Sequence, residues 1–189
     1  VIFDEWAQML ANNGFLVLQP QYRGSKGYGQ RFYQIAFSNG GQGGYKMQDD
    51  KDDGVAWAVA EGLASGDRVA MFGWSYGGYA ALVAASRTPQ IYQCVIAGAA
   101  VTDPEMQVNY YRYRLRGRSK VEQLRMWDDS VAPINEVEQV NVPILLIHGT
   151  VDQRVPLEHA KRYRRALLRA EKEHSYQELK GADHFSNTL

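Results

Sequence analysis

The sequence predicts an α/β fold in which a mostly parallel β-sheet carries helices on both faces. Short runs made almost entirely of apolar residues alternate along the chain with longer segments of helical periodicity. A strand that is apolar at successive positions leaves no face for solvent, as in a parallel sheet covered on both sides. Ligands of such sheets bind beyond the carboxyl ends of the strands, so each candidate site residue can be tested by whether it follows a strand.

The expected elements follow one another regularly. Apolar runs of strand length lie at 15–20, 68–74, 92–100 and 142–150, and a run of alternating character lies at 174–180. Helical patterns lie at 1–14, 30–37, 49–62, 76–87 and 156–170. Asp103 before Pro104 indicates the N-cap and first residue of another helix, and a polar, arginine-rich region follows it.

Composition limits the classes of protein to consider. The chain has 189 residues, 45% hydrophobic and 22% charged, which is typical of one folded globular domain. Its 21 basic residues balance 21 acidic ones, so neither nucleic acid nor an anionic membrane is expected as a partner. No apolar run approaches the ~18 residues of a membrane span. The single cysteine, Cys94, lies in an apolar run and is interpreted as a small buried side chain rather than a catalytic one.

Ser75 stands between glycines in GWSYGG, residues 73–78, directly after an expected strand and before an expected helix. The G-x-S-x-G nucleophile elbow requires this context. Such a turn is strained, and side chains at neighbouring positions would clash with the adjacent strand and helix, which explains the glycines. Because the following helix directs its amino end at the serine, the backbone N–H of Tyr76 is expected to stabilise an oxyanion. A serine that only caps a helix would not explain glycines on both sides.

A nucleophilic serine needs a base, and the base needs an acid that holds its tautomer. In the α/β-hydrolase arrangement the acid and then the histidine follow the serine along the chain. Of the four histidines, only His184 follows the last expected strand on a loop. His148 ends an expected strand, His159 lies inside an expected helix, and His174 opens an expected strand.

Two aspartates, Asp152 and Asp103, each follow an expected strand closely. Asp103 already has an explanation as an N-cap, whereas Asp152 lies on the loop nearer in sequence to His184. We therefore predict a triad of Ser75, Asp152 and His184, with Asp103 as the alternative acid. This chemistry needs no cofactor, and no cluster of His, Cys and carboxylates has the spacing of a metal site.

Four stretches together are similar to the catalytic domain of the prolyl oligopeptidase family: QPQYRGSKGYG, GWSYGGYAA, LLIHGTVDQRVP and GADHF. The resemblance runs from about Val17 to the end of the chain. It implies an α/β-hydrolase fold and a serine peptidase acting on short peptides. It also implies that Ser75 is the nucleophile, Asp152 the orienting acid and His184 the general base, with Tyr76 as an oxyanion donor through its backbone.

The resemblance also implies substrate-binding residues. Arg154 stands two residues after the acid, where oligopeptidase and acylaminoacyl-peptidase branches carry an arginine that contacts a substrate carbonyl. Dipeptidyl-peptidase branches tend to carry asparagine there, so the acylaminoacyl-peptidase-like branch is favoured. Val101, Tyr110 and Tyr111 follow the preceding strand, where the family lines its first specificity pocket.

Further parts of the family architecture are expected outside this chain. The chain opens inside a helical pattern and closes at Leu189 without a terminating element. We therefore expect residues 1–189 to be a single catalytic domain truncated at both ends, with an upstream β-propeller and the first strands in the parent protein. A carboxylesterase with the same triad and a dipeptidyl-peptidase-type exopeptidase are the alternative functions. A non-catalytic binding module is disfavoured because such relatives usually lose the nucleophile.

Overall fold

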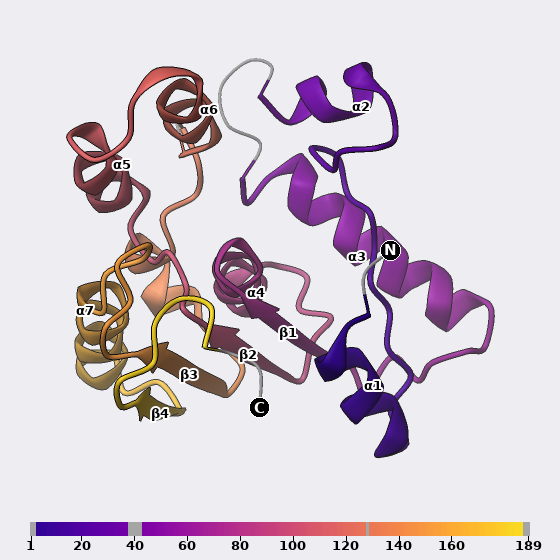
Figure 1. The fold of residues 1–189 in the computed structure, drawn as a ribbon. Coiled ribbons are helices and arrows are strands. Elements are labelled where there is room, and N and C mark those ends of the chain that lie inside the picture. Colours follow the sequence, from indigo (N-terminus) through magenta and orange to yellow (C-terminus); the bar gives the residue numbers. More distant parts are fainter. Residues whose placement is uncertain (1–2, 38–42, 128, 187–189) are drawn as a thin grey trace.

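The computed structural model describes residues 3–37, 43–127 and 129–186. Its centre is a four-stranded sheet, parallel throughout, whose strands lie side by side in sequence order (Figure 1). The strands are β1 (Ala70–Trp74), β2 (Cys94–Gly98), β3 (Ile144–Gly149) and β4 (His174–Leu179). Because all of them run in one direction, their carboxyl ends meet at one edge of the sheet. The predicted parallel α/β architecture is confirmed.

The helices alternate with the strands or precede them. The longer ones are α1 (Glu5–Asn12), α2 (Gln30–Gln34), α3 (Lys46–Ala60), α4 (Tyr76–Ser86), α5 (Pro104–Arg112), α6 (Gly117–Trp127) and α7 (Glu158–Arg169). Three short 3-10 turns are η1 (Ile35–Phe37), η2 (Pro133–Asn135) and η3 (Val137–Gln139). None of these described helices is long and apolar enough to span a membrane.

Helices pack on both faces of the sheet, α4 and α7 on one and α1 on the other. On one face, a single buried cluster joins Leu82 of α4, Leu146 of β3 and Leu167 of α7. On the other face, the ring of Trp6 in α1 lies 5.1 Å from the ring of Phe72 in β1. Successive side chains of a strand point to opposite faces, so one apolar strand supplies both layers. Helix α4 is the central helix, and most of its small, alanine-rich surface is buried.

The segment 15–20 was predicted to be a strand, and this prediction is wrong. The segment forms no strand, and Phe15, Leu16 and Leu18 are 61%, 60% and 41% exposed. A strand requires hydrogen bonds to a neighbouring strand, and no described part of the chain pairs with these residues. Cys94, interpreted as buried, is only partly buried at the start of β2.

The boundaries of two helices differ from the predicted ones. Helix α1 begins at Glu5 because the Asp4 carboxylate accepts a hydrogen bond from the Ala7 N–H at 3.0 Å. Helix α3 begins at Lys46, ahead of the predicted start at 49. Asp103 does cap α5, as predicted. The arginine-rich region, for which no element was predicted, contains the end of α5 and all of α6.

Candidate active site

Ser75 occupies a strained turn between β1 and α4. Its φ is +60° and its ψ is −116°, a conformation that residues with side chains rarely adopt. The Ser75 N–H donates to the Gly98 carbonyl at 2.8 Å, which ties the turn to the end of β2. Strain of this kind persists only where surrounding contacts hold it, and it exposes the side chain at the top of the sheet.

The glycines near Ser75 have separate structural reasons. A Cβ on Gly73 would lie 2.2 Å from the Gly77 carbonyl carbon, so the end of β1 can touch the start of α4 only at a glycine. A Cβ on Gly78 would lie 2.4 Å from the Gly98 carbonyl oxygen, where α4 crosses β2. A Cβ on Gly77 would meet nothing within 4 Å. The predicted clash therefore applies to Gly73 and Gly78 but not to Gly77.

The side chains of Ser75, His184 and Asp152 form a continuous hydrogen-bonded chain. His184 Nε2 lies 2.9 Å from Ser75 Oγ, and His184 Nδ1 lies 2.7 Å from Asp152 Oδ2. These contacts join residues 109 and 32 positions apart in the sequence. Each residue follows a different strand, β1, β3 or β4, so the parallel sheet brings them to one edge.

Asp152 is held as a carboxylate. Its side chain is 0% exposed, and Oδ1 accepts the N–H groups of Arg154 and Val155 at 2.8 and 2.9 Å. Burial raises the pKa of Asp152, but the hydrogen bonds from His184 and the two amides lower it by more, so its pKa lies below the usual value. With Asp152 accepting at Oδ2, His184 Nδ1 carries the proton and Nε2 can accept one from Ser75.

Two side chains that the sequence analysis did not predict also hold the site. The Trp74 indole N–H donates to the His184 carbonyl at 2.9 Å, which ties the loop after β4 to the end of β1. His148 Nε2 lies 2.9 Å from the Val155 carbonyl and 3.6 Å from Asp152 Oδ2. Burial lowers the pKa of His148, so this ring is a neutral donor beside the acid. The sequence signals for them were the adjacency of Trp74 to Ser75 and the position of His148 four residues before Asp152.

The alternative acid has a different role. Asp103 Oδ1 accepts the Met106 N–H at 3.0 Å, and Oδ2 lies 3.1 Å from the Arg162 guanidinium. The other histidines away from the triad are His159, buried in α7, and His174, which opens β4 at the opposite edge of the sheet. The structure therefore pairs His184 with Asp152 and gives Asp103 a capping role.

Tyr76 is the first residue of α4, where a backbone N–H has no acceptor within the helix. Its ring packs against a buried cluster, here called the Tyr76 cluster, which consists of Tyr79, Val83, Val101, Trp127 and Val155. Val101 is 2% exposed and lies in this cluster, not among the residues that line the open pocket beside His184. The chain from Ala99 to Thr102 runs through the interior, which places the Val101 side chain inside.

A pocket of about 790 Å³ opens beside the triad. Its lining residues come from α5, the turn after it, and the loops after β3 and β4: Tyr110, Tyr111, Arg114, Leu115, Val151, Gln153, Arg154, Asp183, His184 and Phe185. Tyr110, Tyr111 and Arg154, all predicted to bind substrate, therefore share one pocket with His184.

Hydrogen bonds between α5 and the loop after β3, which carries Asp152, hold this pocket together. The Tyr110 hydroxyl donates to the Gln153 carbonyl at 2.5 Å, and the Gln107 side-chain amide donates to the Arg154 carbonyl at 2.9 Å. The Arg154 guanidinium carbon lies 5.8 Å from the Phe185 ring centre. The arginine side chain thus extends from the loop after β3 toward the loop after β4.

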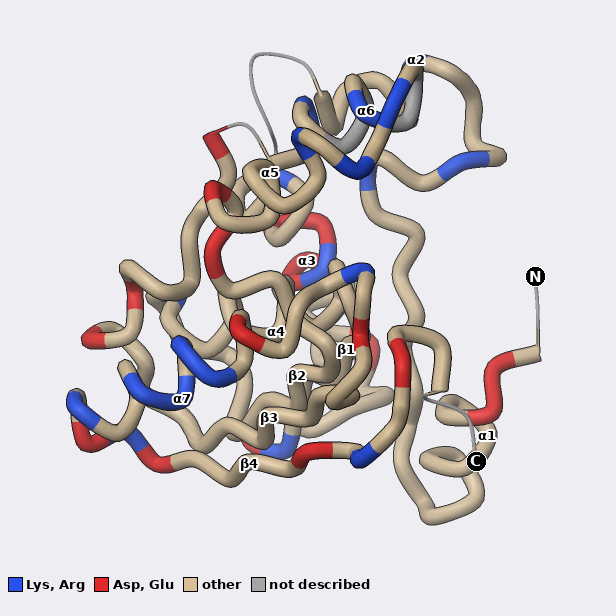
Figure 2. The backbone as a smooth tube through the Cα atoms, turned by 60° about the vertical axis from the view of Figure 1, so that its left-hand side comes forward, with Lys and Arg blue, Asp and Glu red and all other residues tan. Residues whose placement is uncertain are grey.

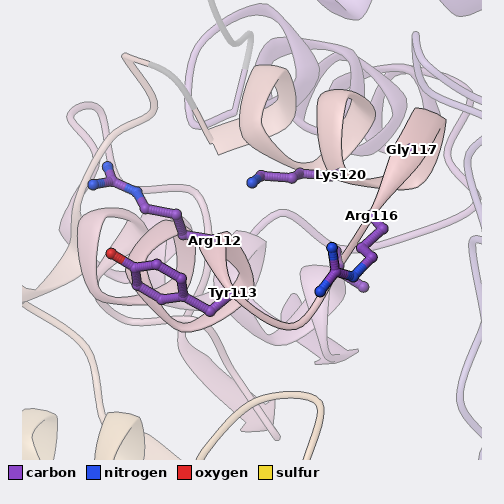
Figure 3. A pocket seen from close by; sticks show the side chains of 6 residues that line it. Arg112, Tyr113, Arg116, Gly117 and Lys120 are labelled. Carbon is purple, nitrogen blue, oxygen red and sulfur yellow. The ribbon is translucent and has the colours of Figure 1, made fainter.

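A second hollow, of about 430 Å³, lies between α5 and α6 (Figure 3). It is lined by Arg112, Tyr113, Leu115, Arg116, Gly117 and Lys120. Basic positions gather along this part of the backbone tube (Figure 2). Leu115 lines both hollows, so the two adjoin, and Arg114 and Arg154 bring positive charge to the pocket beside the triad. In the described ranges, no group of three or more His, Cys, Asp and Glu residues could hold a metal ion.

A serine on a strained strand–helix turn, followed in chain order by an aspartate and a histidine at the carboxyl edge of a parallel sheet, defines the α/β-hydrolase class. The model of the prolyl oligopeptidase family matches residues 2–188. The chain belongs to this family.

Relatives of the chain carry several peptidase names. Dipeptidyl aminopeptidase BIII of Pseudoxanthomonas mexicana is 33% identical over 165 residues, covering 81% of this chain and 23% of the relative. The acylamino-acid-releasing enzyme of Rattus norvegicus is 30% identical over 173 residues, covering 84% and 23%. The structure of Pyrococcus horikoshii acylaminoacyl peptidase matches with a TM-score of 0.70 at 23% identity, covering 88% and 27%. The chain thus spans 23% to 27% of the length of these proteins.

Proposed function

We propose that this chain is the catalytic domain of a serine peptidase that hydrolyses short peptides through an acyl-enzyme. The observation that carries the proposal is the hydrogen-bonded chain from Ser75 through His184 to Asp152, which starts at a strained turn. Membership in the prolyl oligopeptidase family and the names of the relatives support a peptide substrate.

In the first half of the reaction, Ser75 Oγ attacks the carbonyl carbon of the scissile bond while its proton passes to His184 Nε2. The tetrahedral intermediate collapses when His184 gives this proton to the leaving amine, and the acyl group remains as an ester on Ser75. In the second half, water attacks the ester and its proton passes to His184. Collapse returns the proton to Ser75 and releases the acid product. Asp152 stabilises the imidazolium in both halves without taking the proton itself.

The Tyr76 N–H is the proposed donor to the oxyanion of both tetrahedral intermediates. Its place at the start of α4 supports this role, because the amino end of a helix carries partial positive charge. The donor is fixed before the reaction, so no reorganisation is needed when the negative charge develops.

The proposed substrate is a blocked peptide or oligopeptide that lies across the pocket beside the triad. Arg154 can donate its planar fork to a backbone carbonyl there, with Tyr110 and Tyr111 on the α5 side. The proposed partner is a β-propeller of the same polypeptide that restricts access to short peptides, as the family resemblance implies. The span of the chain, 23% of the curated relatives, leaves room for such a domain.

A dipeptidyl-peptidase-type exopeptidase is the second candidate. The observation that favours it is the 33% identity to dipeptidyl aminopeptidase BIII, against 30% to the acylamino-acid-releasing enzyme. Arg154 favours the first candidate, since its guanidinium suits a carbonyl acceptor and would repel a free peptide amine.

The test is kcat/KM of the full natural polypeptide that carries this chain, measured on an acetylated amino-acid anilide, a free-amine dipeptide anilide and a nitrophenyl ester. Ser75→Ala is the control. Anilide hydrolysis that disappears in Ser75→Ala is the expected result, and preference for the blocked anilide over the free-amine one supports the first candidate. Turnover of the ester alone would make the chain a carboxylesterase and overturn the peptidase proposal.

A further inference from the structure

Lys51 of α3 is a buried cation that the proposed reaction does not use. It is 7% exposed. The aspartates on both sides of it pair with other cations, Asp50 with Arg23 at 2.5 Å and Asp52 with Arg87 at 3.1 Å. Within the ranges that the structure describes, no carboxylate forms an ion pair with Lys51.

The Lys51 ammonium instead faces two aromatic rings. Its Nζ donates to the Met47 carbonyl at 2.5 Å. The same nitrogen lies 3.5 Å from the centre of the Tyr22 ring and 5.6 Å from that of the Tyr76 ring. These two rings stack, with centres 5.9 Å apart and planes at 24°. The Tyr76 hydroxyl also lies 3.3 Å from Met47 Sδ, so ammonium, rings and first turn of α3 form one packed unit beside Ser75.

Stability does not explain a charge at this position. Burial removes the hydration of the ammonium and lowers the pKa of Lys51 to about 7. Cation–π contacts offset part of this cost, but a neutral side chain of the same length would fill the space without it. Because Tyr76 follows Ser75 directly, a role at the site is the alternative explanation.

We propose that Lys51 is a positioning residue that holds the Tyr76 ring and thereby fixes the oxyanion donor beside Ser75. The inference rests on the proposed function, in which the Tyr76 N–H is that donor. The ammonium lies over the Tyr22 ring, and the Tyr76 ring stacks on that ring at the edge of the ammonium's reach. Because the Tyr76 amide belongs to the same residue as this ring, anchoring the ring limits rotation of the amide. Donors that are fixed in place stabilise a developing charge better than donors that must reorient.

The test compares Lys51→Met, Lys51→Arg and the control Lys46→Met in the full natural polypeptide. Lys46 lies in the same helix with its side chain 63% exposed, so it controls for loss of a lysine from α3. The readouts are kcat, KM, melting temperature and inhibition by a peptide aldehyde. The aldehyde adds Ser75 Oγ reversibly and presents an oxygen to the oxyanion donor.

We expect Lys51→Met to lower kcat by about 10- to 100-fold, less than the ~10²- to 10³-fold cost of removing an oxyanion donor outright. KM should stay nearly unchanged, aldehyde affinity should fall by the same factor as kcat, and the melting temperature should stay equal or rise. Lys51→Arg should recover most of kcat, because it restores the charge, and Lys46→Met should match the wild type. If the arginine variant does not fold, the aldehyde result with Lys51→Met decides alone.

A Lys51→Met enzyme with wild-type kcat and aldehyde affinity would overturn the proposal, whatever its melting temperature. A loss confined to KM would overturn it too, since that would be a substrate-binding effect. The proposed function is tested separately: if the wild type hydrolyses the anilide and Ser75→Ala does not, it stands even when the Lys51 variants refute the positioning role.

Discussion

Two histidines of this chain are buried to a similar degree but lie in different surroundings. His184 is 5% exposed and His159 is 0% exposed, and both make hydrogen bonds through both ring nitrogens. His184 lies on a loop, with the Asp152 carboxylate at Nδ1 and the Ser75 hydroxyl at Nε2. His159 lies in α7, with a backbone N–H at Nδ1 and the Gln107 amide oxygen at Nε2.

The group that accepts a hydrogen bond from each ring decides what that ring can do. This acceptor is the Asp152 carboxylate at Nδ1 of His184 and the Gln107 amide oxygen at Nε2 of His159. A carboxylate stabilises the imidazolium, so His184 can take a proton from Ser75. The Gln107 amide accepts a hydrogen bond without carrying charge, and burial lowers the pKa of His159 to about 3. Two buried rings that each bond through both nitrogens are therefore a candidate base in one case and a neutral structural link in the other.

The largest expected effect comes from replacing each histidine by glutamine. His184→Gln removes the base and should lower kcat by about 10⁶-fold while the melting temperature changes little. His159→Gln should leave the kcat of the folded enzyme close to that of the wild type, but cost about 1–3 kcal/mol of stability because a buried hydrogen bond is lost. Anilide turnover and thermal unfolding by circular dichroism measure both. A folded His159→Gln enzyme that is as inactive as His184→Gln would contradict the comparison.

Asp152→Asn replaces the carboxylate beside His184 by an uncharged side-chain amide, the kind of acceptor that His159 has in Gln107. The amide cannot stabilise the imidazolium and favours the wrong tautomer, so kcat should fall by about 10⁴-fold. The matched control is Asp103→Asn, which keeps a capping side chain and should leave kcat unchanged. Steady-state kinetics on the blocked anilide give both values. Near-normal turnover by Asp152→Asn would require another carboxylate as the acid.

The pH dependence of stability should report His159. Burial lowers its pKa from 6.5 to about 3 in the folded chain. Between these values the unfolded chain binds a proton that the folded chain does not, so stability should fall as pH drops through this window. The slope is at most ~1.4 kcal/mol per pH unit from this group. Urea unfolding between pH 7 and pH 4 measures it, and His159→Gln should show a shallower dependence. Equal slopes would mean that other groups cause the loss.

The smallest expected effect concerns the acid that lies outside the triad. Asp103 pairs with Arg162 at 3.1 Å, and the arginine side chain is 43% exposed. Because solvent screens such a pair, Arg162→Gln should cost about 0.2–1 kcal/mol of stability and leave kcat unchanged. Urea unfolding and anilide turnover test this. A large fall in kcat would connect Asp103 to the reaction.

Local patterns were sufficient to predict the four strands of the sheet and to select candidate site residues. Successive apolar residues indicate strands that are buried on both faces. The glycines around Ser75 indicate a tight strand–helix turn, because larger residues would not fit at those positions. The choice of Asp152 over Asp103 also followed from sequence, since a residue before proline at a helix start already has a capping explanation. Each of these inferences depends on neighbours in the chain.

Contacts between distant segments had to come from the tertiary structure. The run at 15–20 has the composition of a strand, but pairing depends on a neighbouring strand that composition does not specify. Val101 follows β2 as predicted, yet the path of the chain places its side chain in the Tyr76 cluster. The Trp74 indole meets the His184 carbonyl across 110 positions, and Lys51 reaches the ring of Tyr76. The order of the elements and the candidate residues of three loops could be predicted from the sequence, because they depend on local patterns. Packing placed the side chains that support the triad, because side-chain direction depends on the elements that surround it.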